Sequence, residues 1–197
     1  MGNLHLFELI NAAPGLGPVR LVLAAVLAQW LIWLVPIAMT IAWVRGDIVA
    51  RAELLQMLLA ASIALGLAQI VVHVWPQPRP FALHLGTQYL QHGNDPGLPS
   101  DHVTVFWSLA FSALTSRRYA VWGLPLMAIG LVVGWARVYL GVHFPFDIIA
   151  ALPVALASAV IAHGLRRPLS PAAARILHLY DDCIGRARSR RDAARKA

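Results

Sequence analysis

Three short polar segments interrupt an otherwise apolar chain, and their side chains could together handle a phosphate group. They combine guanidinium groups, imidazole rings, a hydroxyl and carboxylates. A guanidinium binds phosphate oxygens through a planar fork of N–H groups. An imidazole can attack phosphorus or protonate a leaving oxygen, and a carboxylate can orient it. The segments are Arg79-Pro80, Pro99-Ser100-Asp101-His102, and Arg137 with His143 and Asp147.

The composition places these segments in a membrane protein. Of the 197 residues, 59% are hydrophobic and only 13% are charged, whereas about a quarter of the residues in a soluble domain are charged. The single cysteine, Cys183, excludes an internal disulfide and a thiolate zinc cluster. We therefore expect an all-α integral membrane bundle over residues 1–166, followed by a basic cytoplasmic tail over residues 167–197.

Five apolar stretches predict about five transmembrane helices, since a bilayer-spanning helix needs roughly 20 apolar residues. A short amphipathic helix at the membrane interface is expected before them, within residues 1–17. A surface helix is expected in the tail, within residues 172–194. A long polar loop, residues 76–99, separates the second and third stretches. The predicted spans are residues 19–44, 54–75, 100–116, 119–139 and 146–165.

Arginine and lysine residues are concentrated on one side of this predicted topology. They lie in the loops after the first and third spans and in the tail. Positive charge favours the cytoplasmic side, so the tail is expected in the cytoplasm, where anionic lipids account for its charge better than nucleic acid does. The three polar segments then meet at the opposite, outer face, where they would form one pocket.

The second polar segment opens the predicted third span. Ser100 suits the N-cap position, and the amides of the first helical turn would point outward with the positive end of the helix dipole. A phosphate would bind well there, and His102 could donate a proton to a departing oxygen. Alternatively, Ser100 only caps the helix and His102 is an ordinary interface residue.

The third polar segment opens the predicted fifth span. Pro145 suits the first helical position and leaves His143 just before the helix. Asp147 can then reach back to one ring nitrogen and leave the other free as a nucleophile. Arg137 and Arg79 would hold the phosphate and neutralise its charge. The alternatives are a structural histidine–aspartate pair and an arginine that extends to the interface.

The three segments resemble the signature motifs of the type 2 phosphatidic acid phosphatase superfamily, which also includes the vanadium haloperoxidases. The resemblance covers about the second to the fifth span. It implies a helical bundle and a phosphatase reaction that needs no metal and no cofactor. It also implies a phosphohistidine intermediate on His143, with Asp147 as its partner and His102 as general acid. The implied phosphate-binding residues are Arg79, Pro80, Ser100, Asp101 and Arg137.

Three positions depart from the family pattern. Val72 stands where the first motif usually has a lysine, and His73 and Gln77 are nearby polar residues that could partly replace it. Asp101 replaces a glycine, and Ala136 replaces a serine. The exact strings are similar to one bacterial branch, the undecaprenyl-diphosphate phosphatases associated with bacitracin resistance. These strings are residues 78–81, 99–102 and 136–145, with residues 9–12 near the N-terminus.

The resemblance implies hydrolysis of undecaprenyl diphosphate to the monophosphate and phosphate, at the periplasmic face of a bacterial inner membrane. The expected partners are this polyprenyl diphosphate and membrane lipids, with no nucleic acid. A broader phosphatase acting on phosphatidate or phosphatidylglycerophosphate stays open, as does a transferase that phosphorylates lipid A. A non-catalytic anion-binding membrane protein is the alternative from another class. His84 and His92, in the outer loop, are expected to stay outside the chemistry.

Overall fold

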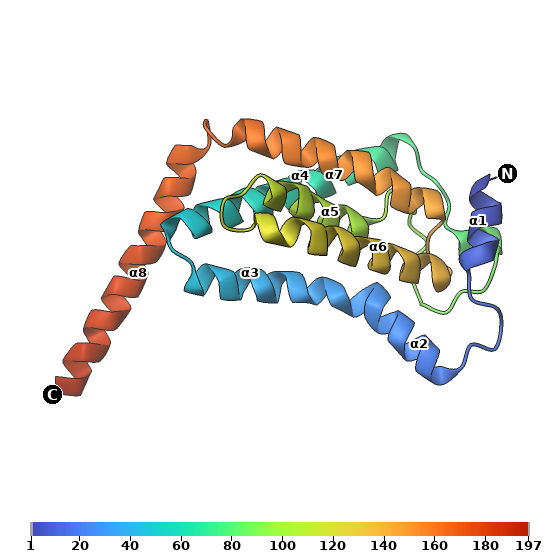
Figure 1. Cartoon of the computed structure of the whole chain (residues 1–197), viewed down its shortest axis with the longest axis horizontal. Coiled ribbons are helices and arrows are strands. Elements are labelled where there is room, and N and C mark those ends of the chain that lie inside the picture. The colour runs from blue at the N-terminus through green and yellow to red at the C-terminus, as the bar shows by residue number, and fades with distance from the viewer. Residues whose placement is uncertain (1, 197) are drawn as a thin grey trace.

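The computed structural model describes residues 2–196, with side chains described for residues 2–183. All regular secondary structure in these residues is helical, which confirms the predicted fold class. Figure 1 shows long helices packed side by side. The short α1 (Gly2–Ile10) lies at one end of this bundle, and α8 (Ser170–Lys196) crosses the other end.

The centre of the bundle is α5 (Asp101–Leu114), which packs against α4 (Ile48–Val74), α6 (Gly123–Tyr139) and α7 (Pro145–Leu165). With 14 residues, α5 is only ~21 Å long and falls short of the roughly 30 Å hydrocarbon core. The predicted third span, residues 100–116, is thus present as a helix that is shorter than the other predicted spans. Within the described residues, four helices are long and apolar enough to cross a membrane: Pro18–Arg45, Ile48–Val74, Ala120–Tyr139 and Pro145–Leu165.

Protein groups at both ends of α5 explain how a short helix is accommodated inside the membrane domain. At its start, the Ser100 amide donates to the Asp147 carbonyl at 3.1 Å. Beyond its end, the buried Glu53 carboxylate accepts hydrogen bonds from the Ser116 hydroxyl and from the Arg117 and Arg118 amides, at 2.6 to 3.0 Å. These partners satisfy polar groups that lipid cannot satisfy.

The predicted first span is bent rather than continuous. It comprises α2 (Pro18–Ala25), a π-helical turn (Val26–Trp30), a 3-10 turn (Leu31–Trp33) and α3 (Leu34–Arg45). Figure 1 shows the change of direction between α2 and α3. Pro36 has no N–H to donate to the carbonyl one turn earlier in the helix. The π-helical and 3-10 turns therefore lie directly before it.

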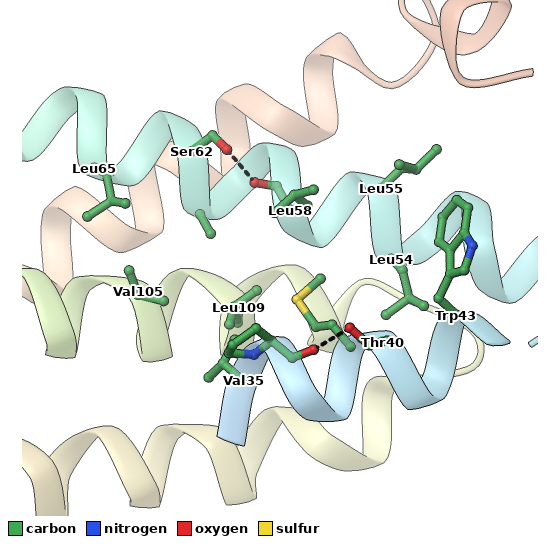
Figure 2. A pocket seen from close by; sticks show the side chains of 13 residues that line it. Val35, Thr40, Trp43, Leu54, Leu55, Leu58, Ser62, Leu65, Val105 and Leu109 are labelled. Atoms are coloured by element: carbon green, nitrogen blue, oxygen red, sulfur yellow. Dashed lines mark hydrogen bonds between the residues drawn. The ribbon is translucent and has the colours of Figure 1, made fainter. Parts of the chain in front are cut away.

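An apolar groove of about 470 Å³ lies between α3, α4 and α5. Figure 2 shows its walls, in which the two hydroxyl groups bond to carbonyls of their own helices. Thr40 donates to Pro36 at 2.7 Å, and Ser62 donates to Leu58 at 2.9 Å. The surface left facing the groove is therefore hydrocarbon.

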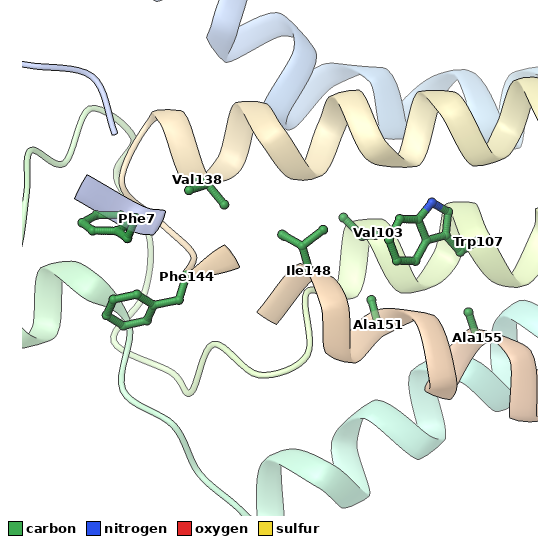
Figure 3. Close-up of a cluster of buried hydrophobic side chains, with 8 residues drawn as sticks. All are labelled: Phe7, Val103, Trp107, Val138, Phe144, Ile148, Ala151 and Ala155. Atoms are coloured by element: carbon green, nitrogen blue, oxygen red, sulfur yellow. The ribbon is translucent and has the colours of Figure 1, made fainter. Parts of the chain in front are cut away.

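The predicted N-terminal helix is present as α1, and it packs against the helical domain through a buried side chain. Its Phe7 is fully buried and meets Phe144 edge to face, with ring centroids 5.2 Å apart. Figure 3 shows the two rings at one end of a buried apolar cluster that continues between α5 and α7. This cluster lies beside the α6–α7 turn and fixes its position. Its members are Phe7, Val103, Trp107, Val138, Phe144, Ile148, Ala151 and Ala155.

The predicted tail helix is present as α8, and it is attached to the end of the bundle away from α1 (Figure 1). Arg51 pairs with Asp181 at 2.9 Å and lies over the Tyr180 ring, 4.5 Å from its centroid. The Tyr180 ring also contacts Trp43 edge to face. The basic residues of the α3–α4 and α5–α6 loops lie at this same end, opposite the polar segments.

Candidate active site

The three polar segments converge at the α1 end of the bundle, around the ring of His143. The helix α7 begins at Pro145, with Phe144 as its N-cap, so His143 lies just before the helix as predicted. Nδ1 of His143 is 3.1 Å from Oδ2 of Asp147, which also accepts a hydrogen bond from the Phe144 amide at 2.8 Å. Because the carboxylate accepts, Nδ1 carries the ring hydrogen.

The other ring nitrogen of His143 faces Arg79. Nη1 of Arg79 is 3.1 Å from Nε2 of His143 and 3.0 Å from the Val142 carbonyl. A guanidinium is only a donor, so Nε2 presents its lone pair. The neutral ring is thus held as one tautomer from both sides, and both residues are almost completely buried. This is the protonation state that a nucleophilic imidazole needs.

Arg79 is also bound to the outer loop that precedes α5. Nε donates to the Asp95 carbonyl at 2.9 Å, and Nη2 contacts the Asp95 carboxylate at 3.0 Å and the Pro96 carbonyl at 3.4 Å. With the contacts to Val142 and His143, these bonds use all five N–H groups of the guanidinium. A phosphate that binds Arg79 must therefore replace one of these partners.

Arg137, near the end of α6, retains donor capacity. It is 3% exposed, and Nη1 donates to the Ala28 carbonyl at 3.1 Å. Ala28 lies in the π-helical turn, so the bend in the first span provides this acceptor. Nη2 donates to Nε2 of His92 at 3.1 Å. Among the described residues, no acceptor pairs with the buried Nε, which leaves a guanidinium with N–H groups for an anion.

The start of α5 adds polar atoms that have no hydrogen-bond partner among the described residues. Ser100 is the N-cap residue, as predicted, but its buried hydroxyl does not cap the helix. Oδ1 of Asp101 and the hydroxyl of Thr104 are buried and unpaired as well. The half-buried His102 makes no side-chain hydrogen bond with any described residue and lies within the electrostatic influence of both site arginines. These groups could meet a ligand.

The remaining predicted residue, Pro80, is buried and begins a 3-10 turn, Pro80–Leu83, directly after Arg79. Its fixed φ angle defines the chain direction as it leaves the arginine. Neither of the polar residues proposed to replace the missing lysine makes a side-chain hydrogen bond with a site arginine in the described residues. His73 is exposed on α4, and the side chain of Gln77 makes no hydrogen bond with a described residue.

Sequence reasoning missed two residues of the outer loop, His92 and Asp95, each of which contacts a site arginine. Nδ1 of His92 lies 3.4 Å from the Asp95 carboxylate. Burial, followed by the charge on Arg79, lowers the pKa of His92. Burial alone would raise the pKa of Asp95, but its hydrogen bond to Arg79 and the charge of that arginine bring the pKa below its usual value. The sequence feature that could have indicated this pair is the spacing of three residues between the His92 imidazole and the Asp95 carboxylate, shortly before Ser100.

A buried, tautomerically fixed imidazole beside two guanidinium groups, inside a membrane bundle, is an arrangement suited to phosphoryl chemistry. The chain belongs to the PAP2 superfamily, whose pattern matches residues 53–169. These residues contain all three polar segments described above.

Curated relatives extend this similarity along the chain. The chain is 37% identical over 151 residues to YbjG of Escherichia coli, provisionally named an undecaprenyl-diphosphatase, covering 76% of this chain and 75% of the relative. It is 25% identical over 183 residues to the undecaprenyl-diphosphatase BcrC of Bacillus subtilis, covering 91% of this chain and 94% of the relative. The crystal structure of Aquifex aeolicus LpxE shares the fold, with a TM-score of 0.68, 21% identity, and 83% and 96% coverage of this chain and that chain.

Proposed function

We propose that the protein hydrolyses undecaprenyl diphosphate to undecaprenyl phosphate and inorganic phosphate. The observation that carries the proposal is the neutral His143 ring, whose Nδ1–H faces Asp147 and whose Nε2 lone pair faces Arg79. This arrangement suits in-line attack on a phosphorus held among cations. The substrate assignment is supported by the names of the two curated relatives and by the motif strings.

In the proposed first step, Nε2 of His143 attacks the terminal phosphorus of the lipid diphosphate. A P–N bond forms, the bridging P–O bond breaks, and His102 protonates the oxygen of the departing lipid phosphate. Arg137 and Arg79 neutralise the charge on the transferred phosphoryl group. Asp147 stabilises the positive ring, because it accepts the Nδ1–H hydrogen bond.

The second step releases the phosphate. Water gives a proton to His102 and attacks the phosphohistidine, the P–N bond breaks, and inorganic phosphate leaves. The two guanidinium groups supply the positive charge that a metal ion would otherwise provide. We therefore propose that the reaction proceeds without metal and is unchanged by EDTA.

The prenyl chain would occupy the groove between α3, α4 and α5. Val105 and Leu109 of α5 line this groove, one and two helical turns below the polar start of that helix at Asp101. The basic loops and α8 lie at the opposite end of the bundle (Figure 1). Because positive charge favours the cytoplasmic side, we propose that the site faces the periplasm of a bacterial inner membrane.

A substrate panel tests the proposed function. Phosphate release by purified protein is measured in parallel with undecaprenyl diphosphate, phosphatidate and phosphatidylglycerophosphate. The expected result is the highest kcat/KM for undecaprenyl diphosphate, with no change on adding lipid A. Preference for a monophosphate lipid, or phosphate appearing on lipid A instead of in solution, would contradict it. His143→Ala should abolish release, whereas His163→Ala, at an exposed position of α7, should not.

A further inference from the structure

We propose that His92, supported by Asp95, is a further substrate-binding residue that holds a phosphate together with Arg137. This proposal rests on the proposed function, because the phosphate in question belongs to the lipid diphosphate. The residue comes from the outer loop, outside all three signature segments. Its role would be binding the anion, with the bond-making steps left to His143 and His102.

The geometry around His92 repeats that around His143. In each case Nδ1 lies near a carboxylate, at 3.4 Å for Asp95 and 3.1 Å for Asp147, and Nδ1 of His92 also lies 3.2 Å from the Gly93 carbonyl. In each case Nε2 lies 3.1 Å from a guanidinium nitrogen, of Arg137 for His92 and of Arg79 for His143. The two rings are neighbours in an edge-to-face arrangement, with centroids 6.4 Å apart.

The two arginines connect these histidines into one site. Arg79 contacts both His143 and the Asp95 carboxylate, so the loop carrying His92 is tied to the nucleophile. Arg137 contacts His92 through Nη2 while its buried Nε has no partner among the described residues. A phosphate beside Arg137 would therefore be within reach of the His92 ring, whose side chain is 27% exposed.

Protonation would make His92 a donor to that phosphate. In the structure Nε2 accepts a hydrogen bond from Arg137, so the ring is neutral there. A bound phosphate dianion adds negative charge, and a proton taken from solvent onto Nε2 would let His92 donate to a phosphate oxygen. Asp95 would stabilise the resulting imidazolium.

Several charges bear on this protonation. Burial, the charge on Arg79 and that on Arg137 lower the pKa of His92, whereas the hydrogen bond to the Gly93 carbonyl and the charge on Asp95 raise it. In the ligand-free protein the ring is thus mostly neutral at pH 7, and phosphate binding opposes the surrounding positive charge. Proton uptake on binding means that affinity falls as pH rises. The groups around His92 are Arg79, Asp95, Asp101, His102, Arg137 and His143.

Titration of the protein with inorganic phosphate tests this role independently of the lipid. Calorimetry at pH 6 and pH 8 compares the wild type, His92→Gln and His84→Asn. His84 is an exposed residue of the same loop in a left-handed conformation, which asparagine tolerates. We expect His92→Gln to weaken binding about tenfold at pH 6 and to reduce the loss of affinity between pH 6 and pH 8. His84→Asn should bind like the wild type.

Turnover of undecaprenyl diphosphate gives the second measurement. His92→Gln should raise KM about tenfold with kcat within about threefold of the wild type. Asp95→Asn should also raise KM, and this variant tests the pair if His92→Gln fails to fold. Unchanged phosphate affinity, or a fall in kcat at constant KM, would overturn the proposal. If phosphate binding depends on His92 but undecaprenyl diphosphate is not hydrolysed, the proposed function fails and the binding role stands.

Discussion

Gly97 lies against the His143–Asp147 pair so closely that a Cβ atom there would be 3.1 Å from Oδ2 of Asp147. The same Cβ would be 3.1 Å from Cγ of Arg79 and 3.6 Å from Nδ1 of His143. The loop before α5 thus forms one wall of the site through a residue that has no side chain.

Replacing Gly97 with alanine should therefore displace these side chains and lower kcat at least tenfold, since small misplacements in an active site are costly. Gly66→Ala is the matched control, because a Cβ on this α4 glycine meets nothing within 4 Å. Both variants are assayed for phosphate release and for thermal unfolding. A wild-type kcat in Gly97→Ala would show that Gly97 does not pack closely against Asp147, Arg79 and His143.

Asp147→Asn tests the fixed tautomer of His143. The amide keeps the size of the side chain but loses the charge that stabilises the imidazolium ring. We expect kcat to fall by roughly 10³-fold with a much smaller change in KM. Asp181→Asn, at the opposite end of the bundle, should leave kcat unchanged. Equal effects from the two substitutions would indicate a general loss of structure.

Asn11→Ala tests the attachment of the N-terminal segment to the site. Its side chain donates to the Thr87 and Tyr139 carbonyls at 3.0 and 3.1 Å and accepts from the Thr87 amide at 2.7 Å. Loss of three hydrogen bonds should cost about 2–3 kcal/mol of stability, a fall in Tm of roughly 5–10 °C for a chain of this size. Asn94→Ala, at an exposed loop position, should change Tm by less than about 2 °C.

Ser62→Phe tests the groove as the site of the prenyl chain. Ser62 lines the groove and lies ~18 Å from the end of α4 nearest the active site. The larger ring should exclude a few methylene groups of undecaprenyl diphosphate and raise KM roughly tenfold. Geranyl diphosphate, whose short chain does not extend that far, should be hydrolysed with unchanged KM. A similar rise for both substrates would place the long chain elsewhere.

The sequence alone predicted the membrane helices and the pairing of His143 with Asp147. Runs of apolar residues report lipid exposure directly, and Pro145 sets the first turn of α7, so an aspartate two residues later must reach back toward His143. Both features are local, because the residues of a single segment determine them.

Other features depend on contacts between distant segments and could not be predicted in this way. Glu53 and Asp147, from α4 and α7, satisfy polar groups just beyond the two ends of α5, and neither contact can be read from the α5 segment itself. The acceptor for Arg137 at Ala28 requires the π-helical turn of the first span. His92 appears solvated when read within its loop, and its role emerges only when α6 places Arg137 beside it.

The proposed mechanism requires that Nε2 of His143 becomes covalently phosphorylated. Protein mixed with undecaprenyl diphosphate carrying ³²P in the terminal phosphate is quenched in alkali within the first turnover and digested for mass spectrometry. The expected result is an acid-labile, alkali-stable phosphoryl group on His143 that is absent from His143→Ala. Turnover without any labelled intermediate, or label on another residue of the wild-type protein, would contradict it.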